Sequence, residues 1–134
     1  MANTFEVYVV TPEREVWSGR ASILIALGSE GDFAIMAGHV PMLTELQIGP
    51  LFLTTEDGER IAAAVDGGFL HCVSQGGADT RVDVLAEHAE LEPEIDLDRA
   101  RRLKEDAERR IAADHDAHAE ADLAKALTRI NLLG

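Results

Sequence analysis

The chain has 134 residues, enough for one globular domain with a small appendage, and this length excludes two large domains. Its formal net charge of −13, from 25 acidic and 12 basic side chains, disfavours a nucleic-acid ligand, because phosphates require a basic surface. The single cysteine excludes an internal disulfide, and no apolar run approaches the roughly 20 residues of a membrane-spanning helix, so we expect membrane association only through a partner.

Apolar and polar side chains alternate over much of residues 1–87, which predicts half-buried β-strands. Two groups of apolar residues that share a strand face are Phe5, Val7 and Val9, and Ile23, Ile25 and Leu27. Further strands are expected at 13–17, 32–36, 50–55, 59–65, 68–74 and 80–85, with a hairpin turn at Asp57-Gly58. Because no helical period intervenes, the pattern predicts an N-terminal antiparallel β-sandwich over 1–87.

The pattern changes at residue 88. The acidic, proline-broken stretch 88–95 predicts a linker, and Asp96 is a favourable helix N-cap. Apolar residues then recur at helical spacing, as Ala100, Leu103, Ala107 and Ile111, and as Ala119, Leu123, Leu127 and Ile130. This predicts a C-terminal antiparallel two-helix hairpin over 96–134. Since each alanine buries little area, worth roughly 25 cal/mol per Å², we expect the hairpin to dock weakly.

Several blocks of sequence together resemble one protein family. They are Glu30-Gly31-Asp32, Gly38-His39-Val40-Pro41-Met42-Leu43-Thr44, Gly49, Asp66-Gly67-Gly68-Phe69-Leu70, Val84-Leu85-Ala86-Glu87 and Ile95-Asp96-Leu97-Asp98-Arg99-Ala100. This set closely resembles the epsilon subunit of rotary F-type ATP synthases over nearly the whole chain. The resemblance implies a non-catalytic subunit of the central stalk, which couples proton-driven rotation to ATP synthesis and inhibits ATP hydrolysis through its C-terminal helices.

The resemblance also implies partners and a location. The partners would be the gamma subunit, the c-ring and the alpha/beta catalytic hexamer, at the cytoplasmic face of the bacterial plasma membrane. The residues that would meet gamma and the c-ring are Asp32, His39, Met42 and Leu43. Spacing alone favours a different role for His39, in a turn where its imidazole satisfies a buried carbonyl, so both roles stay open.

Residues 95–100 are similar to the ATP-binding motif I-D-x-x-R-A of some bacterial epsilon subunits. The resemblance implies no required cofactor but a regulatory ATP, with the binding residues Glu90, Ile95, Asp96, Arg99, Ala100, Lys125 and Arg129. Asp96 can accept a hydrogen bond from a base amine, and Arg99 can bind phosphate oxygens as a fork. Asp106 stands where nucleotide-binding relatives carry a cation, so its charge opposes phosphate and leaves ATP binding open.

Half of the basic residues lie within 99–110. On a helix they can form a solvated face paired with Glu105 and Glu108. In an extended hairpin they could instead contact acidic partner segments and inhibit the hexamer, through Arg101, Arg102, Arg109 and Arg110. Both interpretations stay open from the sequence.

We find no catalytic constellation and no metal site in the sequence. Gly67-Gly68 lacks the following helix and lysine of a phosphate loop, so it predicts a bulge or crossing point of strands. His115 and His118 have the spacing of two zinc ligands but no evident third. The alternative hypothesis is a free-standing β-sandwich that binds a small molecule, or a cupin-like metalloenzyme using His39, His71 and His88.

Overall fold

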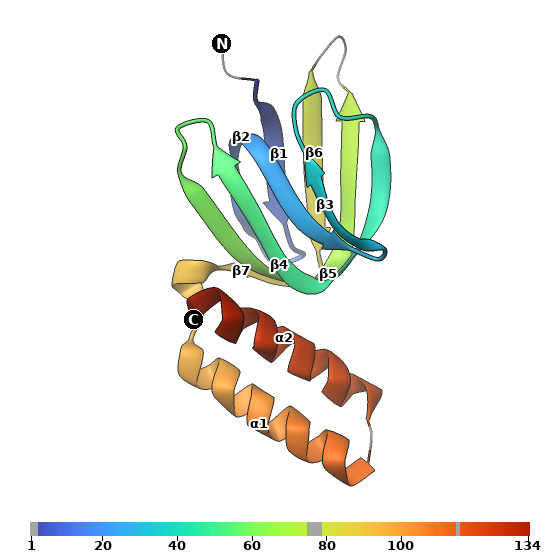
Figure 1. Ribbon diagram of the computed structural model, residues 1–134, viewed down its shortest axis with the longest axis vertical. Coiled ribbons are helices and arrows are strands. Elements are labelled where there is room, and N and C mark those ends of the chain that lie inside the picture. Colours follow the sequence, from blue (N-terminus) through green and yellow to red (C-terminus); the bar gives the residue numbers. More distant parts are fainter. Residues whose placement is uncertain (1–2, 75–78, 115) are drawn as a thin grey trace.

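The computed structural model describes residues 3–74, 79–114 and 116–134. A β-structured unit lies above a helical hairpin, with the C-terminus at the junction between them (Figure 1). The strands are β1 (Phe5–Val10), β2 (Glu15–Gly28), β3 (Gly31–Ile35), β4 (Met42–Thr55), β5 (Arg60–Ser74), β6 (Thr80–Ala86) and β7 (Ala89–Leu91). A 3₁₀ turn, η1 (Glu92–Glu94), precedes the helices α1 (Leu97–Asp114) and α2 (Ala117–Leu133).

The strands form one sheet that curls into a barrel-like sandwich. Its order is β1-β6-β5-β4-β2-β3, and β1 also pairs with β2, so five strands close a ring. A ring with an odd number of strands cannot alternate direction throughout, and β1 and β6 are accordingly parallel while the other pairs are antiparallel. The predicted sandwich followed by two helices is confirmed, except that it is not antiparallel throughout.

The core lies inside the ring and is made of alternate side chains from every long strand. Phe5, Val7 and Val9 point inward and are at most 1% exposed. In β2 the face shared by Ile23 and Ile25 is the outer one, since the buried side chains are Leu24 and Ala26. The pairing register of β2 with β4 shifts after Ala21, and this shift changes which side chains face inward. Alternation therefore identifies a strand but not which face is inside.

Two strands are longer than predicted, because residues expected to break pairing sit inside them. The expected strand 50–55 is part of β4, where Pro50 pairs opposite Ala64, close to a shift in the β2–β4 register. The expected strands 59–65 and 68–74 are one strand, β5, which passes through Gly67 and Gly68 at φ +88° and +132°. The predicted bulge or crossing at this pair is confirmed, because a Cβ on Gly68 would lie 2.2 Å from the Leu85 carbonyl oxygen.

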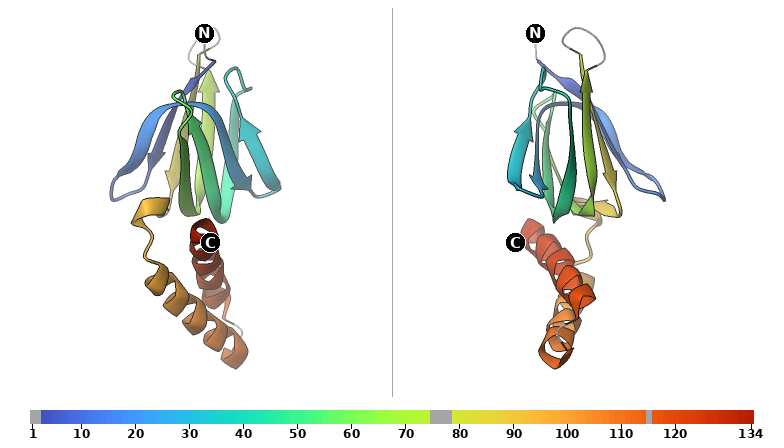
Figure 2. Two further views of the ribbon diagram at one scale, coloured as in Figure 1. Left: turned by 60° about the vertical axis from the view of Figure 1, so that its left-hand side comes forward. Right: turned by 90° about the vertical axis from the view of Figure 1, so that its right-hand side faces the viewer.

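The stretch 88–95, predicted as a linker, is largely ordered structure. Ala89–Leu91 forms β7 on the edge of β5, and η1 then turns the chain toward the helices. Asp96 caps α1, since its Oδ1 accepts from the Arg99 backbone N–H at 3.1 Å. The two helices pack on each other, and α2 packs against β4 and β5 (Figure 2). No helix in the described ranges is long and apolar enough to cross a membrane.

Candidate functional site

The junction between the β-unit and the hairpin is centred on Arg129 of α2. Its side chain is 9% exposed, and it forms a two-pronged ion pair with Asp66 of β5, whose side chain is 7% exposed. The two bonds run from Nη1 to Oδ1 at 2.8 Å and from Nη2 to Oδ2 at 2.9 Å. This fork geometry orients the guanidinium as well as neutralising it.

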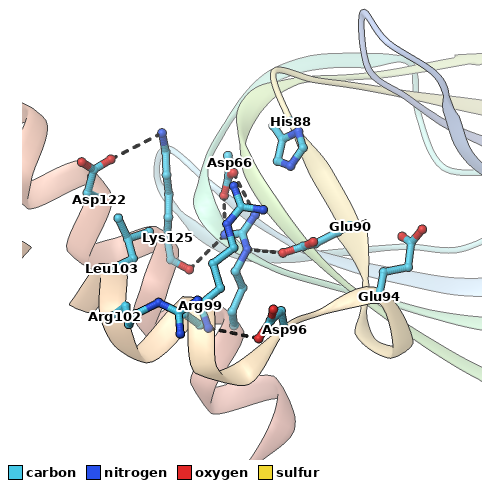
Figure 3. Close-up of a pocket in the computed structure, with 12 residues that line it drawn as sticks. Asp66, His88, Glu90, Glu94, Asp96, Arg99, Arg102, Leu103, Asp122 and Lys125 are labelled. Atoms are coloured by element: carbon cyan, nitrogen blue, oxygen red, sulfur yellow. Dashed lines mark hydrogen bonds and ion pairs between the residues drawn. The ribbon is translucent and has the colours of Figure 1, made fainter. Parts of the chain in front are cut away.

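Glu90 of β7 supplies a second carboxylate to the same guanidinium. Its Oε1 accepts from Arg129 Nε at 2.5 Å, and the Lys125 carbonyl accepts from Nη1 at 3.0 Å. Figure 3 shows the carboxylates of Asp66 and Glu90 pointing into the same space, each at the end of a dashed line. Burial disfavours the charged guanidinium, but the hydrogen bonds and charges of Asp66 and Glu90 outweigh it, so the pKa of Arg129 lies above its ordinary value.

An open hollow of about 530 Å³ lies beside this cluster, between the β-unit and both helices. Its lining includes six of the seven residues predicted to bind ATP, namely Glu90, Asp96, Arg99, Ala100, Lys125 and Arg129. Ile95, the seventh, is half-buried outside this lining. The hollow is also lined by residues that the sequence did not indicate as nucleotide ligands, namely Asp66, His88, Glu94, Arg102, Leu103 and Asp122.

The cations of the hollow differ in how strongly they are already paired. Arg129 is neutralised by two carboxylates, and Lys125 Nζ lies 3.9 Å from Asp122 Oδ1. Within the described part of the chain, no side-chain ion pair involves Arg99 or Arg102, and both are exposed. The cations of the hollow that are not already held in an ion pair therefore lie on α1.

Asp106, expected to oppose bound phosphate, lies off the hollow. Its Oδ2 lies 3.2 Å from Arg110 Nε, and its Oδ1 lies 3.4 Å from Arg109 Nη2. Arg110 also pairs with Asp122 of α2, and so it ties the two helices together. Of the four arginines expected to meet the hexamer, Arg110 is thus half-buried inside the hairpin, whereas Arg101, Arg102 and Arg109 are exposed.

The residues predicted to meet gamma and the c-ring do not gather at one place on the β-unit. Asp32 is exposed at the start of β3, and His39 follows its end, so the two lie at opposite ends of that strand. His39 Nδ1 lies 2.7 Å from the Val40 carbonyl oxygen, in an exposed loop and not at a buried carbonyl. Leu43 is 68% exposed, whereas Met42 packs against the core.

The described residues contain no group of three or more His, Cys, Asp and Glu placed to hold a metal ion. His39, His71 and His88 therefore do not form the centre that the cupin-like hypothesis requires. Of the pair His115 and His118, the first lies outside the described residues.

Comparison with known proteins decides the family. A family model for the ATP synthase delta/epsilon chain, β-sandwich domain, matches residues 4–92. The ATP synthase epsilon chain of Streptomyces coelicolor is 43% identical over 120 residues, which cover 90% of each chain. The chain belongs to the epsilon subunits of F-type ATP synthases.

The likeness to epsilon subunits extends beyond the β-unit. The epsilon chain of Nitratidesulfovibrio vulgaris is 37% identical over 139 residues, which cover all of this chain and 98% of that relative. The Euglena gracilis mitochondrial ATP synthase contains a chain that superimposes with a TM-score of 0.75 at 21% identity, covering 99% of this chain and 80% of that one. This solved structure supports the fold of the epsilon chain from end to end, including the helical hairpin.

Sequence reasoning missed Asp66 as part of the site. It lies in the Asp-Gly-Gly-Phe-Leu block, whose glycines predict a bulge or crossing of strands but whose acid has no role in that pattern. A signal was present, because Asp66 follows the apolar run 61–65 within one strand. A carboxylate in such a run is buried only when a cation pairs with it.

Proposed function

We propose that the chain is a non-catalytic regulatory subunit of its ATP synthase. The β-unit binds gamma and the c-ring through Asp32, His39, Met42 and Leu43. The hairpin brakes ATP hydrolysis when it extends toward the alpha/beta hexamer, where Arg101, Arg102 and Arg109 contact acidic segments. In a bacterium this places the chain at the cytoplasmic face of the plasma membrane, held there by the complex.

One observation carries the proposal: the hairpin has little apolar burial to hold it. The apolar side chains that are fully buried in the described parts of α1 and α2 are alanines, namely Ala100, Ala107, Ala119 and Ala126. Each alanine buries far less apolar area than a leucine, so the hydrophobic contribution to docking is small. A segment held in this way can leave its site at modest free-energy cost, as a mobile brake requires.

The test of the brake uses the complete ATP synthase complex. It is assembled with the full chain or with a chain lacking 96–134, and its ATP hydrolysis rate is measured at equal occupancy. We expect the shortened chain to assemble and the rate to rise, because the blocking segment is gone while the β-unit is unchanged. An unchanged rate in a fully assembled complex would contradict the brake.

A regulatory ATP in the hollow is the second part of the proposal. Asp96 and Ala100 would hold the adenine, and Arg99, Arg102 and Lys125 the phosphates. Calorimetric titration of the isolated chain with ATP tests it. We expect Arg99→Gln to weaken binding about 10-fold or more, since it removes a charge-assisted fork, and Arg109→Gln, on the same helix but off the hollow, to change little. No heat at millimolar ATP would remove this part.

A further inference from the structure

The hairpin and the β-unit are joined by one buried ionic cluster, the triad Asp66, Glu90 and Arg129. Its members come from β5, β7 and α2. Along the chain, Asp66 lies 63 positions before Arg129 and Glu90 lies 39 positions before it. All three guanidinium nitrogens of Arg129 donate to a carboxylate of the β-unit. No other ion pair in the described residues joins α1 or α2 to a strand.

The triad couples docking of the hairpin to the pairing of its charges. A buried charge that loses its partner is strongly unfavourable, because burial has already cost it its hydration. Release of the hairpin returns all three charges to water together. When one partner is missing, release therefore removes the cost of an unpaired buried charge, whereas in the complete triad it breaks favourable ion pairs. In the described parts of α1 and α2 the fully buried apolar side chains are alanines, so little fully buried apolar area opposes release.

We propose that the triad Asp66, Glu90 and Arg129 is a latch that sets the equilibrium between the docked and the released hairpin. The proposed brake assumes a mobile hairpin, and the latch would control that mobility. To that extent the latch rests on the proposed function. The latch has a consequence for the hollow. Because two carboxylates hold the guanidinium of Arg129, the phosphates of a bound nucleotide would be contacted by Arg99, Arg102 and Lys125. Arg129 acts on such a ligand only indirectly, by keeping the hairpin in place.

The experiment measures hairpin release in the isolated full-length chain without nucleotide. Nitroxide labels at Glu56→Cys in the β4–β5 turn and Ala112→Cys on α1, both exposed sites, report the separation by electron double resonance. Cys72 stays in place, because it is buried in the core and inaccessible to the label. The populations of short and long distances give the released fraction.

Removing one partner should open the latch. We expect Arg129→Gln and Asp66→Asn each to raise the ratio of released to docked chain at least about 10-fold. Glu90→Gln should have a smaller effect, since the Glu90 side chain is 24% exposed. Arg129→Lys, which keeps the charge but loses the fork, should fall between the parent and Arg129→Gln. The matched control is Arg109→Gln, an arginine that is 71% exposed and pairs only within α1.

The double variant separates a latch from a general loss of packing. In Asp66→Asn/Arg129→Gln the ratio of released to docked chain should not exceed that of Arg129→Gln alone, because Arg129→Gln has already broken the ion pair that Asp66→Asn would remove. Amide exchange of the β-unit, unchanged in every variant, would show that the sandwich still folds. Distance distributions of Arg129→Gln and Asp66→Asn equal to those of Arg109→Gln would overturn the latch.

These outcomes are independent of the proposed brake. The distances are measured without ATP and without the catalytic complex, so an unchanged ATPase rate on deletion of 96–134 would refute the brake and leave the latch intact. Conversely, a docked hairpin in both charge variants would refute the latch whatever the ATPase rate.

Discussion

At the scale of single residues, Gly68 is the position where the fold tolerates no side chain. Its φ is +132°, and a Cβ would lie 2.2 Å from the Leu85 carbonyl oxygen and 2.8 Å from the Ala86 Cα. We expect Gly68→Ala to lower the free energy of unfolding by at least about 2 kcal/mol, because backbone strain and a clash with β6 add together. Urea denaturation measures this loss.

A matched control separates the two causes at Gly68. Gly58 has a φ of +87° but nothing within 4 Å of an added Cβ. Gly58→Ala should therefore cost only the backbone strain, about 1 kcal/mol. Equal losses for the two variants would show that the contact with Leu85 relaxes and that strain alone matters.

Glu94 gives a residue-scale prediction about pH. The hydrogen bond from Arg14 Nη2 at 2.8 Å, and that from the Leu91 backbone N–H at 2.8 Å, lower the pKa of Glu94 below its ordinary value of 4.5. The stabilisation is therefore present above pH 4.5 and is lost as the pH falls through the lowered folded-state pKa. Carboxyl NMR titration should find Glu94 titrating below its ordinary range, and Arg14→Gln should move it back up. An unmoved midpoint in Arg14→Gln would contradict the role of Arg14.

At the scale of elements, the sequence predicted strands and helices well where alternation was uninterrupted. The run Phe5, Val7 and Val9 identified both a strand and its buried face. The predicted strands were too short at Pro50 and at Gly67-Gly68, which lie inside β4 and β5. A proline or glycine also fits where a strand bends sharply, and only the closed ring shows that β4 and β5 must bend there. Local pattern carries no information on that closure.

The helical hairpin depends on alanine at the contact between its helices. Ala107 is fully buried on α1, which packs against α2. Ala107→Leu should weaken the hairpin by about 1–3 kcal/mol, because overpacking forces the helices apart. Hydrogen exchange should rise in 97–133 and stay unchanged in the strands. Ala112→Leu, at an exposed site on α1, is the control, and an equal response in both variants would refute close packing at Ala107.

At the scale of the whole molecule, the site could be predicted only in part. The resemblance supplied Glu90, Asp96, Arg99 and Lys125, and the structure brings them to one hollow. What it could not supply was the partner of Arg129, because Asp66 lies 63 residues earlier and no sequence pattern fixes how α2 sits on β5. Tertiary pairs of this kind are set by the docking of whole units, which a residue-by-residue pattern does not encode.

We predict that the β-unit, to be stable on its own, needs the chain as far as residue 95. Ala89 is fully buried in the core and pairs opposite Val65, and the His88 carbonyl accepts from the Asp66 N–H at 2.8 Å. A chain of residues 1–95 should therefore melt as a complete β-unit. A chain of residues 1–87 should melt at least about 8 °C lower, because it loses β7 and exposes the edge of β5.

Differential scanning calorimetry of the two shortened chains tests this boundary. Both lack Arg129, so the loss of the triad is common to them and cancels in the comparison. Equal melting temperatures would mean that residues 88–95 do serve as a linker. A gap of the expected size would mean that an ATPase assay on a hairpin deletion must keep residue 95, since a cut at residue 87 damages the β-unit and confuses loss of the brake with loss of assembly.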